Sequence, residues 1–224
     1  YLGNSARDNS KVAHIALSGG STPKALFKFI SSSDFSTRIC WSKIHFWWGD
    51  ERCVSPNDPE SNYGQTRALL LDHIDIPEEN IHRIQGEKDP VEEAGRFARE
   101  LKARLPMQNG RPQFDWVVLG IGEDGHTASL FPGRTDYHAD ADSVVAVHPS
   151  SHQQRISLTA PVISTAKRVT YLALGTSKSD IVSKIVSPEE SSKSSYPAAK
   201  IRSYQGVTEI YMDSYAAERL IKEQ

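Results

Sequence analysis

Three observations predict an α/β protein with a mainly parallel sheet. Short apolar runs alternate with longer stretches in which apolar residues recur at helical spacing. Several of these runs end directly in glycine-containing turns, and no linker rich in Pro or Gly divides the 224 residues. Strands that alternate with helices form parallel sheets, and right-handed crossovers place helices on both faces. We therefore expect a single domain over residues 1–224.

The first strand and helix are expected within residues 12–30. Residues 12–17 are an apolar run that stops at a Ser-Gly-Gly turn, as a buried strand would. Apolar residues then recur at helical spacing up to residue 30. Ser21 or Thr22 is suited to cap this helix, and Pro23 falls in its first turn, where a missing N–H is tolerated.

The same alternation predicts the remaining elements. We expect strands at residues 44–48, 81–84, 114–119, 143–147, 155–158, 169–174 and 208–212. Helices are expected at about 91–105, 178–186 and 215–222, and a further helix carries Leu69, Leu70, Leu71 and Ile74. The polar, Ser-rich residues 187–195 are expected to form a surface loop.

Composition excludes several classes of protein. With 38% hydrophobic and 24% charged residues, the chain is globular rather than disordered. A net charge of −2 argues against nucleic-acid binding, which requires a basic excess. No apolar run approaches the roughly 18 residues of a membrane helix, and no signal segment opens the sequence. Cys40 and Cys53 make neither a disulfide framework nor a zinc motif, so we expect a cytoplasmic protein with no metal, membrane or nucleic-acid partner.

Three polar clusters follow predicted strands and mark a candidate site. They lie at residues 18–23, 49–52 and 120–126. In open parallel sheets, ligands bind in the crevice beyond the carboxyl ends of the strands. We therefore expect these clusters, although distant in the sequence, to meet around one ligand.

The turn formed by Ser18, Gly19, Gly20, Ser21 and Thr22 is suited to an anion. Two glycines permit positive φ and close backbone approach, and the helix that follows offers unpaired N–H groups and a partial positive charge. A phosphate or carboxylate would fit there. The turn is neither a Walker A loop nor GxGxxG, which disfavours a nucleotide. A capped turn without a ligand is the alternative.

Arg52 follows the second strand and supplies a cationic fork for a phosphate. Its neighbour Glu51 is a further candidate, because an adjacent carboxylate could hold the guanidinium in place. The alternative is a salt bridge in a surface loop.

The glycine-rich turn at residues 120–126 is expected to present Asp124 and His126 to solvent. A neutral imidazole is the usual general base near pH 7, and a carboxylate beside it can orient the ring and stabilise its cation. Gly125 lies between the two and is a candidate for substrate contact. The alternative is a helix cap by Asp124 with an incidental histidine. Neither a set of metal ligands nor a GxSxG elbow is present in this turn.

An ordered set of motifs across nearly the whole chain resembles the 6-phosphogluconolactonase group of the glucosamine-6-phosphate isomerase/6-phosphogluconolactonase family. The motifs are SGGSTP at 18–23, WGDER at 48–52, SN at 61–62, GIGEDGHTASLFP at 120–132, RISLT at 155–159, Gly175, Lys178, PAA at 197–199 and Asp213. The resemblance implies a Rossmann-like three-layer sandwich similar to glucosamine-6-phosphate deaminase and ribose-5-phosphate isomerase. It also implies hydrolysis of 6-phosphoglucono-1,5-lactone in the oxidative pentose phosphate pathway, without a cofactor.

On this resemblance we expect His126 to act as general base for water, with Asp124 as its partner. The 18–22 turn and Arg52 would hold the phosphate of the sugar lactone. Ser150 stands where family members often carry a phosphate-contacting Lys, so Arg52, Arg155 or Lys178 is expected to take a larger share of the anion.

Further expectations concern the chain as a whole. The family usually has an extra N-terminal segment, so the sequence is expected to lack a short one, and we expect a monomer or a weak homodimer. A sugar-phosphate isomerase or deaminase, or a non-catalytic sugar-phosphate-binding module, are the alternative functions. The sequence HTASLFP at 126–132 favours the lactonase over the deaminase.

Overall fold

The computed structural model describes residues 12–187 and 195–222, so most of the loop expected at 187–195 lies outside the described residues. The strands are β1 (Ala13–Leu17), β2 (Ile44–Trp48), β3 (Asp50–Arg52), β4 (Ile81–His82), β5 (Met107–Gln108), β6 (Arg111–Pro112), β7 (Trp116–Gly120), β8 (Ser143–Val147), β9 (Gln154–Leu158), β10 (Arg168–Ala173) and β11 (Val207–Met212). The α-helices are α2 (Ser21–Ile30), α3 (Ser33–Ser36), α4 (Asn62–Leu69), α5 (Pro90–Arg104), α6 (Ala160–Thr165), α7 (Ser179–Val186), α9 (Pro197–Lys200) and α10 (Glu218–Lys222).

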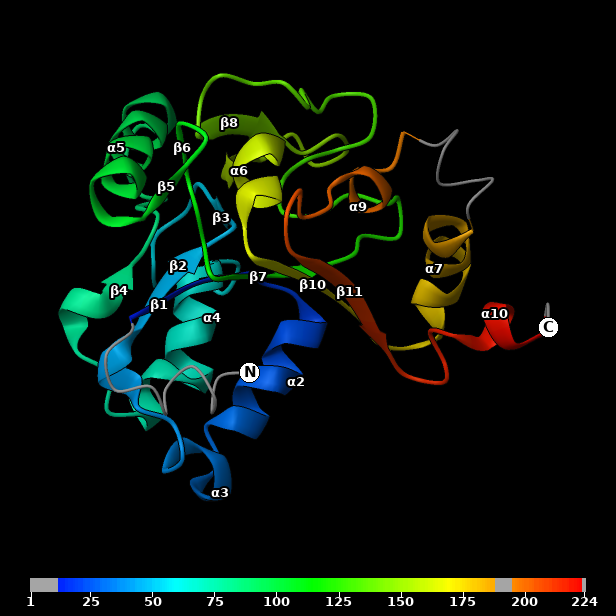
Figure 1. Cartoon of the computed structure of the whole chain (residues 1–224), viewed down its shortest axis with the longest axis horizontal. Coiled ribbons are helices and arrows are strands. Elements are labelled where there is room, and N and C mark those ends of the chain that lie inside the picture. Colours follow the sequence, from blue (N-terminus) through cyan, green and yellow to red (C-terminus); the bar gives the residue numbers. More distant parts are fainter. Residues whose placement is uncertain (1–11, 188–194, 223–224) are drawn as a thin grey trace.

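Six strands form the main sheet in the order β11-β10-β7-β1-β2-β4, and every pairing is parallel. The predicted fold class is thereby confirmed (Figure 1). The chain runs outward from β1 to β2 and β4 on one side, and from β7 to β10 and β11 on the other. The strand order therefore reverses between β1 and β7, where open α/β sheets bind ligands.

Two adjacent tryptophans in β2 show how helices cover both faces of this sheet. Successive side chains of a strand point to opposite faces, and both rings are fully buried. Trp48 packs edge-on against Tyr63 of α4, at 5.4 Å between ring centroids. Trp47 lies 6.0 Å from Phe97 of α5. Helices α4 and α5 thus belong to opposite outer layers of a three-layer sandwich.

The strands expected at 143–147 and 155–158 do not join the main sheet. They are β8 and β9, which pair antiparallel with each other, and β9 pairs antiparallel with β3. The reason is the length of their connection. Residues 148–153 are too few for a parallel crossover, which needs a dozen or more residues, whereas an antiparallel return can be short.

Three further differences concern helix ends. Gly20, at φ 104°, caps α2, where Ser21 or Thr22 was expected. The helix predicted from leucines ends at Leu69, and Leu70 leaves helical geometry. The last helix begins at Glu218, three residues later than predicted. Apolar periodicity thus places these helices but does not fix their end residues.

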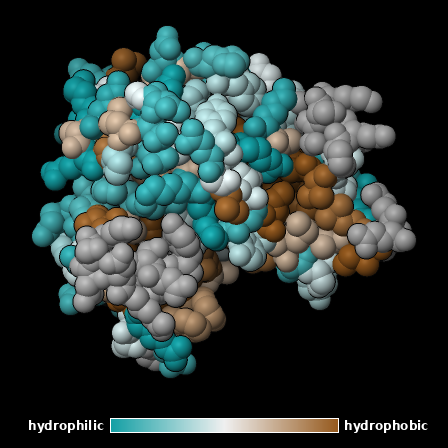
Figure 2. Space-filling model, viewed as in Figure 1, coloured by the Kyte–Doolittle hydropathy of each residue, from teal (hydrophilic) through white to brown (hydrophobic). Residues whose placement is uncertain are grey.

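The surface differs between the two sides of the molecule. In Figure 2 the face over α5 and α6 is mainly hydrophilic, and hydrophobic side chains gather on the side of α7 and α10. Exposed apolar side chains of that region include Leu174, Val186 and Ile221. None of the helices in the described parts of the chain has the length and apolarity needed to cross a membrane.

A histidine cluster lies on β1, β2 and β4, with His14 and His82 buried and His45 half-buried. The indole of Trp47 donates to His14 Nδ1 at 3.2 Å, and the rings of His45 and His82 share a 2.8 Å hydrogen bond. His82 Nδ1 is in turn 2.8 Å from Glu100 Oε1. Burial, followed by the neighbouring His45, lowers the pKa of His14 from 6.5 to about 4. Burial and His82 also lower the pKa of His45.

Acid should therefore destabilise the fold through His14. Because the folded-state pKa lies below the unfolded one, stabilisation is fully present above pH 6.5 and is lost as the pH falls toward 4. The change is about 3 kcal/mol. We expect His14→Gln to lose most of this pH dependence in urea unfolding measured between pH 7 and pH 4.5. His138→Gln, at an exposed histidine, is the control, and an unchanged slope in His14→Gln would contradict the prediction.

Candidate active site

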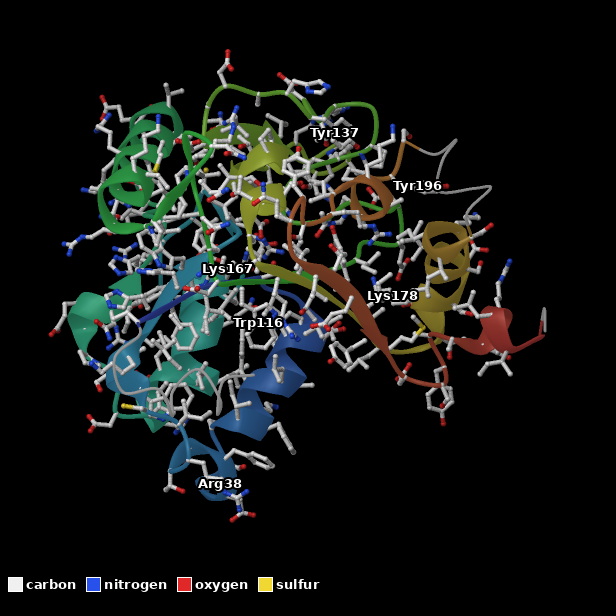
Figure 3. All side chains as sticks on the ribbon, in the orientation of Figure 1. Arg38, Trp116, Tyr137, Lys167, Lys178 and Tyr196 are labelled. Carbon is white, nitrogen blue, oxygen red and sulfur yellow. The ribbon has the colours of Figure 1, made fainter. Side chains whose placement is uncertain are left out.

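The cavity of interest lies where the strand order reverses, at the carboxyl ends of β1, β2 and β7. Its volume is about 180 Å³. Most of the predicted site residues line it, namely Ser18, Gly19, Gly20, Ser21, Thr22, Arg52, His126, Arg155 and Lys178. Segments more than 100 residues apart in the sequence therefore meet there. Figure 3 shows Lys178 beside the lower part of α7, the helix that it directly precedes.

Three candidates do not line this cavity, and eight lining residues were not predicted as site residues. Glu51, Asp124 and Gly125 are absent from the lining. The additional lining residues include Asp50, Asn62, Gly120, Gly122 and Leu172. The sequence motifs contained most of them, but no local signal shows which side chain of a motif will face a cavity.

The start of α2 presents free backbone N–H groups. Gly20 makes no side-chain capping hydrogen bond, the first turn has no acidic residue, and the first intrahelical bond runs from Lys24 N to Gly20 O. The N–H groups of Ser21 and Thr22 are thus available to an anion, reinforced by the helix dipole. Gly19 is required because a Cβ there would lie 1.8 Å from Asn62 Oδ1.

Two arginines face each other across the small sheet. The antiparallel register of β3 and β9 pairs Arg52 with Arg155, so both side chains lie on one face. Directly opposed like charges destabilise a strand pair. Burial, with a contribution from Arg52, lowers the pKa of Arg155. An anion between the two guanidinium groups would offset both effects.

Unpartnered polar atoms concentrate at this cavity. In the described part of the chain, seven buried side-chain atoms have no hydrogen-bond partner in the protein, and four of them belong to residues that line the cavity. They are Ser18 Oγ, Arg52 Nε, Asn62 Oδ1 and Arg155 Nε. Buried polar groups are normally satisfied, so this cluster points to a polar ligand.

Glu51 has a structural position instead of holding the Arg52 guanidinium. Its buried carboxylate accepts the backbone N–H groups of Asn62 and Tyr63 and the hydroxyl of Ser61, and so caps α4. Burial raises its pKa. The guanidinium of Arg52 donates to the carbonyl oxygen of Glu60, at 2.7 Å. Arg52 is thus oriented by a carbonyl, and its charge is not neutralised by the adjacent acid.

The Asp124–His126 pair is held in a tight turn. Asp124 Oδ1 is 2.5 Å from His126 Nδ1 and also accepts the His126 backbone N–H. This contact with His126 lowers the pKa of Asp124 to about 2. With its proton on Nδ1, the ring keeps the Nε2 lone pair for a reaction. No helix follows the turn, which excludes the helix-cap alternative for Asp124.

Comparison with known proteins identifies the family. The model of the glucosamine-6-phosphate isomerases/6-phosphogluconolactonase family matches residues 3–210. The chain belongs to this family. It is 55% identical over 209 residues to 6-phosphogluconolactonase of Haemophilus influenzae, covering 93% of this chain and 87% of that protein. The resemblance found in the motifs is thereby confirmed.

Solved structures of family members share the fold. The crystal structure of the devB protein superposes with a TM-score of 0.94 at 52% identity, over 98% of this chain and 91% of that one. The 6-phosphogluconolactonase of Trypanosoma brucei gives 0.78 at 27% identity, over 93% and 86% of the two chains. A monomeric glucosamine-6-phosphate deaminase, at 22% identity and 0.77, is similar in fold, over 96% and 91%.

Gly122 provides a test of the role expected for the Asp124–His126 turn. A Cβ at this position would lie 2.1 Å from His126 Nδ1 and 2.6 Å from Asp124 Oδ1. Because these are side-chain ends that can move, we expect Gly122→Ala to fold normally but to displace the imidazole. Turnover should fall about tenfold to hundredfold. Gly95→Ala, in α5, is the matched control, and wild-type turnover in Gly122→Ala would contradict the assigned geometry.

Proposed function

We propose that the chain hydrolyses 6-phosphoglucono-1,5-lactone to 6-phosphogluconate, the lactonase step of the oxidative pentose phosphate pathway, with His126 as general base. One observation carries the proposal. A single cavity combines an anion site, made by the start of α2 and the Arg52–Arg155 pair, with an imidazole held by a carboxylate. The relatives named 6-phosphogluconolactonase support the same reaction.

The phosphate of the substrate is bound by the cationic side of the cavity. The N–H groups of Ser21 and Thr22, Arg52 and Arg155 supply donors, and Lys178 adds a further charge at the wall. Arginine forks match phosphate oxygens in pairs. Binding at this end fixes the distance of the lactone carbonyl from His126, which is the part of catalysis that positioning supplies.

Proton transfer is the role of His126. Its Nε2 takes a proton from water while the water oxygen forms a bond to C1 of the lactone. Asp124 stabilises the imidazolium that results. The bond from C1 to the ring oxygen then breaks, and the proton passes from His126 to that oxygen. Attack on C1 places negative charge on the former carbonyl oxygen of the lactone. The N–H groups of Gly122 and Gly125 already donate to carbonyl oxygens within the turn, so other groups have to stabilise this oxyanion.

The reaction needs water and an acid–base group, so the proposal includes no metal and no cofactor. A cytoplasmic location, a monomer or weak homodimer and a small sugar-phosphate lactone as the partner are parts of the same proposal. A sugar-phosphate deaminase or isomerase is the alternative, since a deaminase shares this fold. A coupled assay with freshly prepared lactone, run beside glucosamine 6-phosphate and ribose 5-phosphate, separates them. Lactone hydrolysis above the spontaneous rate supports the proposal, whereas activity on either sugar phosphate alone refutes it.

Removal of the base should abolish most of the turnover. We expect His126→Ala to lower kcat by about 10²–10⁴-fold with an unchanged unfolding midpoint. His152→Ala, at an exposed histidine, is the control. A kcat for His126→Ala within a factor of two of wild type, after subtraction of spontaneous hydrolysis, would exclude the base role.

Loss of a phosphate donor should act on binding. Arg52→Ala or Arg155→Ala removes a charged donor worth roughly 1.5–3 kcal/mol, so KM should rise about tenfold or more. Arg134→Ala is the matched control, because this exposed arginine does not line the cavity. If KM is unchanged in both cavity variants, the phosphate does not bind between these arginines.

A further inference from the structure

A distant segment supports the catalytic turn at Gly125. The backbone N–H of Ala198, in α9, donates to the carbonyl oxygen of Gly125 at 3.1 Å. The ring of Tyr196 lies on the same residue, since a Cβ on Gly125 would be 2.4 Å from Tyr196 Cδ1. Gly125 has φ 82°, a conformation that favours glycine, and directly precedes His126. The segment therefore contacts the backbone that positions the imidazole.

The segment is itself anchored to the main sheet. The hydroxyl of Tyr171, a fully buried residue of β10, donates to Ile201 O at 2.8 Å. Ala198 is completely buried, and Lys200 lies 5.3 Å above the ring of Tyr137. Figure 3 shows Tyr196 at the start of α9 and Tyr137 on the loop beside it. A rigid link thus runs from β10 through α9 to the catalytic turn.

The other hydrogen bonds of the turn are local. Gly122 N donates to His126 O, Gly125 N donates to Gly122 O, and Asp124 contacts His126. Among the described residues, the hydrogen bond from Ala198 N to Gly125 O is the one that connects residues 122–126 to a distant part of the chain. These local bonds preserve the shape of the turn, and the bond from Ala198 connects it to α9.

We propose that Tyr196 is a positioning residue for the reaction, because its ring and the adjoining Ala198 N–H fix Gly125 and thereby the place of His126 in the cavity. This inference rests on the proposed role of His126. Without the ring, the glycine backbone can shift toward the vacated space. A displacement of about 1 Å can lower turnover about 10²-fold. Phosphate binding uses α2, β3 and β9, so it is not affected.

A series of variants tests the proposal by the separation of kcat from KM. We expect Tyr196→Ala to lower kcat about tenfold to hundredfold with KM changed less than about twofold. Tyr196→Leu, which fills part of the space, should be intermediate, and Tyr196→Phe, which keeps the ring, should be close to wild type. Tyr215→Ala removes a 65% exposed tyrosine elsewhere and is the matched control.

The outcomes separate this inference from a purely structural role. Thermal unfolding of each variant is measured together with its kinetics. If Tyr196→Ala does not fold, the kcat of Tyr196→Leu is used to test the inference. A folded Leu or Ala variant with wild-type kcat overturns the inference, as does a variant whose activity falls only in proportion to its folded fraction. His126→Ala is assayed in parallel. If it retains turnover, the proposed base fails; if it loses turnover while the Tyr196 variants do not, only the positioning role fails.

Discussion

Parallel pairing of β1 with both β2 and β7 is the constraint on which the site depends. It brings the turn after Leu17 beside the segment after Trp48 on one side and the turn after Gly120 on the other. The strand order reverses at this point, so the connections leave in opposite directions and a crevice remains between them. The N–H groups at the start of α2 and the His126 imidazole, the two parts of the proposed site, are neighbours because of this register, although the sequence separates them widely.

A second sheet supplies the charge that the main sheet lacks. The chain has a net charge of −2, yet β3 and β9 place Arg52 and Arg155 opposite each other at the cavity wall. Like charges opposed on neighbouring strands destabilise the pair, and the carboxylate of Glu51 is occupied in capping α4. Asp50 and Glu60 offset part of the charge of Arg155. In the proposed function, the phosphate of the substrate adds negative charge between the two arginines. Positive charge is therefore local to the site, in a protein that is close to neutral as a whole.

Sequence patterns predicted the parts of this structure that depend on neighbouring residues. The strands at β1, β2 and β7, the glycine turn before α2 and the Asp124–His126 pair are all local signals. Three features have no local signal in the sequence: the antiparallel pairing of β9 with β3, the capping role of Glu51 and the position of Asn62 at the cavity. They depend on which strand a segment meets in the folded chain, and a single sequence does not encode that register in any short pattern.

The orientation of the ligand is the central claim, with phosphate at the arginine pair and the reacting carbon at His126. A crystal structure with the product 6-phosphogluconate tests it most directly. We predict phosphate oxygens in hydrogen-bond contact with Arg52, Arg155 and the first N–H groups of α2, and the C1 carboxylate beside His126 Nε2. A phosphate bound against His126, or a product molecule outside the cavity, would contradict the account.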